Sequence, residues 1–106
     1  MMRNTQKNDP KDGKNRRNEM RKRVDLLDVE LLDILNKRVA LVIEMGKIKK
    51  KAGMKLYDPG REESVLKRLV EENKGPLDAE AVVRLFERII DESRHAERVR
   101  VYDREG

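Results

Sequence analysis

Hydrophobic side chains recur at alternating steps of three and four residues along the first half of the chain. Between Glu19 and about Ala52 there is no proline and one glycine. This spacing predicts a helix about 50 Å long with one apolar stripe. Because a domain of this size cannot cover so long a stripe with its own residues, the pattern implies a partner chain. The stripe comprises Met20, Val24, Leu27, Leu31, Ile34/Leu35, Leu41/Val42, Met45 and Ile48.

Two shorter helices are predicted after the long one. Lysines and then Gly53 are typical of a helix C-terminus. Asp58, followed by proline, is expected to cap a second helix over about residues 59–73, and Asp78 a third over about residues 79–101. The fold class predicted is all-α, with three helices per chain, one of them very long. The inner faces of the two shorter helices are expected to carry Val65, Leu66, Leu69, Val70, Val82, Val83, Phe86, Ile89 and Ile90.

The composition agrees with helices and narrows the class of protein. Charged residues make up 44% of the 106 residues and aromatic residues 3%, whereas a β-sandwich or barrel is typically rich in aromatic and β-branched side chains. There are no cysteines, which excludes disulfides and fits a reducing cytoplasm. No apolar run approaches the roughly 20 residues that span a membrane, so we expect a cytoplasmic protein with no membrane partner.

The net charge of +5 is concentrated at the N-terminus. Residues 1–18 contain six Lys or Arg and two Asp, and the remaining chain has 20 basic and 19 acidic groups. We therefore expect residues 1–18 to be a disordered basic extension and residues 19–106 to form the folded domain. The near-neutral domain has no aromatic platform for bases, so nucleic-acid binding is not expected.

Four polar residues interrupt the apolar stripes. Arg38 takes a stripe position on the first helix, and Lys49 lies 11 residues later on the same face, about 16 Å along the axis. Ser93 and Glu97 continue the stripe of the third helix in the same way. Each has an ordinary explanation, such as a boundary arginine or a solvated helix end. Together they favour a small anion held between helices.

A second charged group starts the second helix. Asp58, Arg61 and Glu62 lie within one helical turn, where they either cap the helix or face a cavity. Arg21 lies 17 residues before Arg38, about 25 Å along the helix, so only another chain's Arg21 could join the same small ligand. Neither a metal-ligand cluster nor a nucleophile–base pair is visible, so an enzyme of this sequence would hold and polarise an anion.

Three segments resemble the all-helical (AroQ-type) chorismate mutases, in order and over about residues 19–100. The resemblance rests on Arg-x3-Asp-x2-Asp, on Arg38 and Lys49, on the Asp58/Arg61/Glu62 cluster and on the Ile-Ile-x2-Ser segment before Glu97. The segments are "MRKRVDLLDVELLDILNKRVALVIEMGKIKKKAG", "YDPGREESVLKRL" and "GPLDAEAVVRLFERIIDESRHAE".

The resemblance implies an intertwined homodimer that rearranges chorismate to prephenate without a cofactor. It implies that Arg38 holds one substrate carboxylate, the partner's Arg21 the other, and that Lys49 donates to the ether oxygen. It further implies that Glu62 and the Asp58 backbone bind the ring hydroxyl. Arg61 would organise this end of the site, and Ser93 would contact the substrate.

Glu97 departs from many members of the family, which carry glutamine at this position. A glutamine amide donates a hydrogen bond at any pH, whereas a carboxyl donates only when it is protonated. Burial raises the pKa of a carboxyl and Lys49 lowers it, and the sequence does not rank the two effects.

Two alternatives remain open at this point. One is an isochorismate-pyruvate lyase on the same scaffold, and the other is a helical dimer or binding module without catalysis. The length of the chain predicts a monofunctional mutase with no fused dehydratase, dehydrogenase or synthase.

Overall fold

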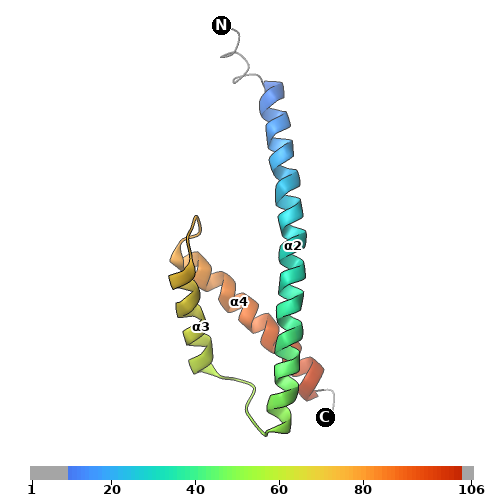
Figure 1. Ribbon diagram of the computed structural model, residues 1–106, viewed down its shortest axis with the longest axis vertical. Coiled ribbons are helices and arrows are strands. Elements are labelled where there is room, and N and C mark those ends of the chain that lie inside the picture. The colour runs from blue at the N-terminus through green and yellow to red at the C-terminus, as the bar shows by residue number, and fades with distance from the viewer. Residues whose placement is uncertain (1–9, 104–106) are drawn as a thin grey trace. The chain divides into compact units, whose positions relative to one another are not determined.

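The computed structural model describes residues 10–103. In this range the chain forms three α-helices, α2 (Pro10–Lys51), α3 (Pro59–Glu72) and α4 (Ala79–Glu97), and a π-helical segment, η1 (Arg98–Tyr102) (Figure 1). Residues 10–103 contain no β-strand, which confirms the prediction of an all-α chain. None of these helices has a stretch long and apolar enough to cross a lipid bilayer.

Helix α2 begins earlier than the sequence suggested. We expected it to start at Glu19, but it starts at Pro10, so residues 10–18 are helical and the expectation of disorder was wrong for them. Proline suits the first turn of a helix, and the lysines and arginines that follow favour helix and keep their charges in water. Residues 1–9 of the expected extension lie outside the described residues. The domain boundary at residue 19 stays a prediction.

The chain divides into two compact units, residues 1–34 and 35–106. The described part of the first unit is helical and carries eight large apolar side chains that are 49–67% exposed. At about 100° per residue they fall on two opposite sides of the helix. Met20, Val24, Leu27, Leu31 and Ile34 form one side, and Leu26, Val29 and Leu32 the other.

The second unit contains the end of α2 together with α3, α4 and η1. Helices α3 and α4 contact each other, and all the apolar residues that we expected on their inner faces are half-buried or, for Val82, buried. Among the described residues, Val82 and Val101 are the only buried hydrophobic side chains. The chain's own core is therefore small for its length.

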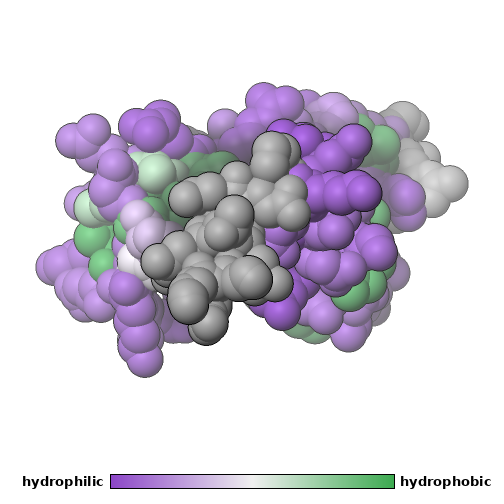
Figure 2. Space-filling model, turned by 90° about the horizontal axis from the view of Figure 1, so that it is seen from above, coloured by the Kyte–Doolittle hydropathy of each residue, from purple (hydrophilic) through white to green (hydrophobic). Residues whose placement is uncertain are grey.

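Within the second unit, α2 presents two different apolar faces. Val39, Val42 and Ile43 are half-buried, whereas Leu41, Met45 and Ile48 are 49–67% exposed. We call these three exposed residues the outer ridge. The single stripe that we predicted therefore combines residues of two faces of α2. One face packs against the same chain, and the other is exposed to solvent. The space-filling view also shows green hydrophobic patches between the purple hydrophilic residues (Figure 2).

The helix ends follow the local sequence closely. Gly53 adopts φ +69°, and the amides of Gly53 and Met54 donate to the carbonyls of Lys50 and Lys49, 3.1 and 2.8 Å away, which closes α2 in a Schellman motif. The Asp58 Oδ1 atom accepts the Arg61 amide at 3.0 Å at the start of α3. Asp78 caps α4 in the same way through the Ala81 amide, at 2.7 Å. Both predicted N-caps are confirmed.

Candidate functional site

A cavity of about 120 Å³ lies within the second unit, among α2, α3 and α4. It receives side chains from each of the three helices and from the segment that precedes α3. Its lining residues are Arg38, Val42, Met45, Lys49, Leu56, Asp58, Arg61, Glu62, Val65, Ile90, Ser93, Arg94 and Glu97. Seven of the eight residues singled out from the sequence are therefore among them, and Arg21 is not.

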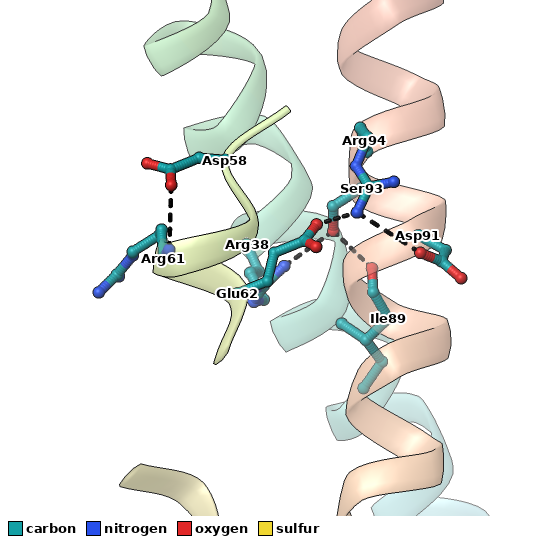
Figure 3. Close-up of polar contacts among 8 residues, drawn as sticks. All are labelled: Arg38, Asp58, Arg61, Glu62, Ile89, Asp91, Ser93 and Arg94. Carbon is teal, nitrogen blue, oxygen red and sulfur yellow. Dashed lines mark hydrogen bonds and ion pairs between the residues drawn. The ribbon is translucent and has the colours of Figure 1, made fainter. Parts of the chain in front are cut away.

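Arg38 is held against helix α4 by Ser93. The Arg38 Nη1 atom donates to Ser93 Oγ at 2.8 Å, and the Ser93 hydroxyl donates to the Ile89 carbonyl at 2.8 Å (Figure 3). Ser93 is buried, with 2% exposure, and Arg38 is half-buried. The hydroxyl thus bonds the backbone of its own helix and also orients the guanidinium. Because Ser93 is neutral, the full positive charge of Arg38 stays available to an anion.

Lys49 and Glu97 meet on the same side of the cavity. Lys49 Nζ lies 3.6 Å from Glu97 Oε2, an ion-pair distance that is too long for a hydrogen bond. The Glu97 side chain is 3% exposed, and its Oε2 atom has no hydrogen-bond partner among the described residues. A buried oxygen without a partner is rare in proteins, so this atom marks a place where a ligand can bind.

Gly46 makes room for the Glu97 carboxyl. Gly46 is buried on α2, and a Cβ atom built on it would lie 2.6 Å from Glu97 Cγ and Oε2. Any side chain at this position would push the carboxyl out of its place. The α2 backbone can therefore approach Glu97 this closely only because position 46 is glycine.

Burial raises the pKa of Glu97 above the ordinary carboxyl value of 4.5, although the charges of Lys49 and Arg94 and the Lys49 contact act in the opposite direction. Loss of hydration is the largest of these effects, because the ionised form is the one that burial disfavours. The structure thus answers the question that the sequence left open: desolvation outweighs the lysine. Protonated Glu97 has an O–H group that can donate a hydrogen bond.

The start of α3 contributes the second charged wall. Asp58 uses its Oδ1 atom as the helix cap, so its carboxylate serves the backbone of Arg61. Arg61 is exposed, and Glu62 is half-buried and forms an ion pair with Arg94 (Figure 3). The cap interpretation and the cavity interpretation of this cluster both hold.

Arg94 is a lining residue that the sequence reasoning missed. Its guanidinium lies 4.8 Å from the centre of the Tyr57 ring and pairs with Glu62. It follows Ile90 by four residues and precedes Glu97 by three, which is helical spacing on one face of α4. That spacing was the available signal.

The charges of the cavity favour a small anion. Arg38, Lys49, Arg61 and Arg94 are cationic, and the three acids are Asp58, Glu62 and Glu97. The net charge of the lining is +1 when all are ionised and +2 when Glu97 is protonated. No group of three or more His, Cys, Asp or Glu side chains in residues 10–103 is arranged to hold a metal ion.

The chain is thus an all-helical protein with a charged cavity among its three helices, and the charge of the cavity suits a small anion. The chain belongs to the chorismate mutase type II family, whose model matches residues 20–98.

Relatives with known names extend this finding. The chain is 40% identical over 76 residues to the bifunctional chorismate mutase/prephenate dehydratase of Stutzerimonas stutzeri, a match that covers 67% of this chain and 21% of that protein. The corresponding enzyme of Neisseria gonorrhoeae is 38% identical over 78 residues, with 74% and 21% covered. The chain thus spans about a fifth of the length of these relatives.

Solved structures share the fold over most of their length. Chorismate mutase (form II) from Thermus thermophilus is 39% identical, with a TM-score of 0.76 over 77% of this chain and 93% of that one. Chorismate mutase from Helicobacter pylori in complex with prephenate is 30% identical, with a TM-score of 0.70 over 76% and 87%.

Proposed function

We propose that this protein is a chorismate mutase, which rearranges chorismate to prephenate in phenylalanine and tyrosine biosynthesis. The observation that carries the proposal is the ion pair between Lys49 and Glu97 in a cavity that Arg38 also lines. The Glu97 Oε2 atom in this pair is buried and has no hydrogen-bond partner among the described residues. Family membership and the similarity to a structure in complex with prephenate support it.

The reaction matches what such a cavity can do. The rearrangement breaks a C–O bond and forms a C–C bond within one molecule, so it needs neither a base nor a nucleophile. It needs a flexible dianion held in a compact conformation, and positive charge where the ether oxygen becomes negative. A lining with a net charge of +1 or +2 attracts such a dianion and stabilises the charge that develops.

The roles proposed for α2 and α4 concern the carboxylates and the ether oxygen. Arg38, oriented by Ser93, binds one carboxylate through its planar fork, and Ser93 also contacts the substrate. Lys49 and Glu97 both donate to the ether oxygen. Glu97 does so only when protonated, and its raised pKa supports this role.

The roles proposed for α3 concern the hydroxyl end of the substrate. Glu62 and the Asp58 backbone bind the ring hydroxyl, and Arg61 organises this end of the site. The position of all three at the cavity wall supports these roles. No cofactor takes part in the reaction as we propose it.

The working form that we propose is an intertwined homodimer in the cytoplasm, in which the partner's Arg21 holds the second carboxylate. Arg21 is exposed, and the helical segment that bears it carries apolar side chains on two opposite sides. The outer ridge is also exposed, and Met45 of this ridge lines the cavity. Exposed apolar surface of this kind is typical of an interface. The outer ridge adjoins the site through Met45.

The direct test is to follow chorismate with the purified protein. We expect prephenate to form, and formation of salicylate and pyruvate from isochorismate would support the lyase instead. Absence of any turnover would support a non-catalytic helical dimer or binding module.

Two substitutions test the cationic residues that we propose to bind the substrate. Removing a preorganised donor costs about 10²-fold or more in kcat, so we expect Arg38→Ala and Lys49→Ala each to lose at least that much activity. Lys47→Ala is the matched control, because Lys47 is exposed and pairs with Glu44 on the surface of the same helix. Wild-type activity in both Arg38→Ala and Lys49→Ala would contradict the proposed site.

A further inference from the structure

Arg94 occupies a central place on α4 that none of the roles above uses. It lies directly after Ser93 and three residues before Glu97, and its side chain is 27% exposed at the wall of the cavity. An arginine that is half-buried beside a site needs a partner for its charge. Its partners come from two other parts of the chain.

The contacts of Arg94 join α4 to the start of α3. Its Nη2 atom pairs with Glu62 Oε1 in the first turn of α3, and it lies 3.6 Å from Asp91 Oδ1 on its own helix (Figure 3). Its guanidinium also faces the Tyr57 ring, 4.8 Å from the ring centre, just before the helix. This is a cation–π distance, and arginine is well suited to stack on an aromatic ring while it donates hydrogen bonds.

We propose that Arg94 is a positioning residue, which fixes the Glu62 carboxylate and, through Tyr57, the start of α3 for the substrate's ring hydroxyl. The inference rests on the proposed function and deepens it. Glu62 has two carboxylate oxygens, and Arg94 engages Oε1. The other oxygen, Oε2, then accepts the hydroxyl in a fixed direction.

The charge of Arg94 has a second effect, on Glu97. Glu97 is faced by Lys49 from α2 and Arg94 from its own helix, and Arg38, Asp58, Arg61 and Glu62 line the same cavity. Both Lys49 and Arg94 lower the pKa of Glu97 against the larger effect of burial. Loss of the Arg94 charge therefore raises this pKa further, so more Glu97 stays protonated at a given pH.

The test compares Arg94→Ala with Arg94→Lys and with Arg88→Ala. Arg88 lies on the same helix, is 76% exposed and pairs with Glu92 at 2.9 Å, and neither residue lines the cavity, so its removal deletes a surface ion pair. Steady-state kinetics with chorismate would be measured for each variant from about pH 5 to about pH 9.

For Arg94→Ala we expect kcat/KM to fall about ten-fold, mainly through KM, because coupled polar pairs change energies by that order. The alkaline fall in activity should also move to higher pH, an effect that a purely structural role would not produce. Arg94→Lys keeps the charge, so the alkaline fall in activity should stay at the wild-type pH. Its KM should lie between those of Arg94→Ala and the wild type. Arg88→Ala should match the wild type in KM and in the pH dependence of activity.

A double variant separates positioning from general damage. Once Glu62→Gln has removed the carboxylate, Arg94→Ala should cost much less than it does in the wild type. Full additivity, or a wild-type KM and pH profile in Arg94→Ala, would overturn this inference alone. Absence of chorismate turnover in the wild type would overturn the proposed function, and this inference with it.

Discussion

Glu97 is the residue whose chemistry depends most on its surroundings. Its side chain is almost fully buried, its Oε2 atom has no hydrogen-bond partner among the described residues, and burial outweighs Lys49 in setting its pKa. A carboxylate in this place would repel an ether oxygen that gains negative charge. In the proposed reaction the neutral acid donates to that oxygen, so the protonation of Glu97 would decide whether it assists the reaction or opposes it.

The pH dependence of activity follows from this. The active form carries the proton, so kcat/KM should be highest below the pKa of Glu97 and fall as the pH rises through it. Because the pKa is raised above 4.5, the fall should come at higher pH than for an exposed carboxyl. Glu97→Gln should flatten the profile, since an amide donates at any pH.

The matched control for this measurement is Glu92→Gln, which changes an acid that is 57% exposed on the same helix. We expect its pH profile to follow that of the wild type. An unchanged profile in Glu97→Gln would show that another group causes the fall.

Single residues were predictable from the sequence where they break a pattern. Arg38, Ser93 and Glu97 each replace an apolar side chain at a stripe position, and the structure brings all three to one cavity. Arg94 and Gly46 were missed. Arg94 has the spacing of the same stripe, but among the many arginines of the chain this spacing was not recognised as a signal. The role of Gly46 depends on which residue of α4 lies opposite, which the sequence of α2 does not contain.

At the scale of elements, the approach of α2 to α4 depends on Gly46. Alanine at this position would overlap Glu97, and overpacking of this kind costs about 1–3 kcal/mol, of which the helix propensity of alanine recovers up to about 1 kcal/mol. We expect Gly46→Ala to lower the free energy of unfolding in urea. We also expect kcat/KM to fall by up to about 10²-fold, because the Glu97 carboxyl moves.

Gly13→Ala provides the control on the same helix. A Cβ atom there has nothing within 4 Å, so the substitution should stabilise the helix by about 0.5–1 kcal/mol and leave activity unchanged. Equal effects of both substitutions would contradict the assignment of Gly46 as the contact point.

The two helix caps separate stability from binding. Asp58→Ala and Asp78→Ala each remove a carboxylate that accepts an amide, so each should lower the free energy of unfolding by about 1 kcal/mol. Only Asp58 lies at the cavity, so only its replacement should also raise KM for chorismate. Denaturant unfolding and steady-state kinetics on both variants would measure this, and an equal rise of KM in both would contradict the role of Asp58.

Helix boundaries were predictable where a cap or breaker marks them. Asp58, Asp78 and Gly53 fixed three ends correctly, because each supplies a specific backbone hydrogen bond or φ angle. The predicted start of α2 was wrong although Pro10 marks it, because the polar and charged composition of residues 10–18 was taken as a sign of disorder, and such residues also extend a helix freely. The sequence also did not separate the two apolar faces of α2, because the residues of both faces recur at steps of three and four.

At the scale of the whole molecule, the proposed dimer makes a prediction about mixed subunits. Arg21→Ala and Arg38→Ala homodimers should each lose most activity, since every site lacks one of the two arginines that bind the substrate carboxylates. When the two variants are unfolded together and refolded, random pairing should restore about a quarter of the wild-type sites, because each mixed dimer regains one complete site. Recovery would be measured as kcat per chain after mixing.

A mixture that stays as inactive as its components would contradict a shared site. Refolding each variant alone is the control, because it shows whether refolding by itself changes activity. The sequence predicts a partner chain from an apolar stripe too long for one chain to cover, and this stays a prediction because the contacts of a dimer are not contained in one chain.

The contact between Gly46 and Glu97 also has a consequence for how relatives of this protein can diverge. A hydrogen atom at position 46 is the only side chain that leaves room for glutamate or its amide at position 97. The exchange of Glu97 for glutamine keeps the size and is open to evolution in a single step. Enlargement at position 46 is not, unless position 97 shortens in the same lineage. Position 46 should therefore stay glycine wherever position 97 is glutamate or glutamine, whereas exchange between those two residues would change the pH range of the proposed activity without changing the packing.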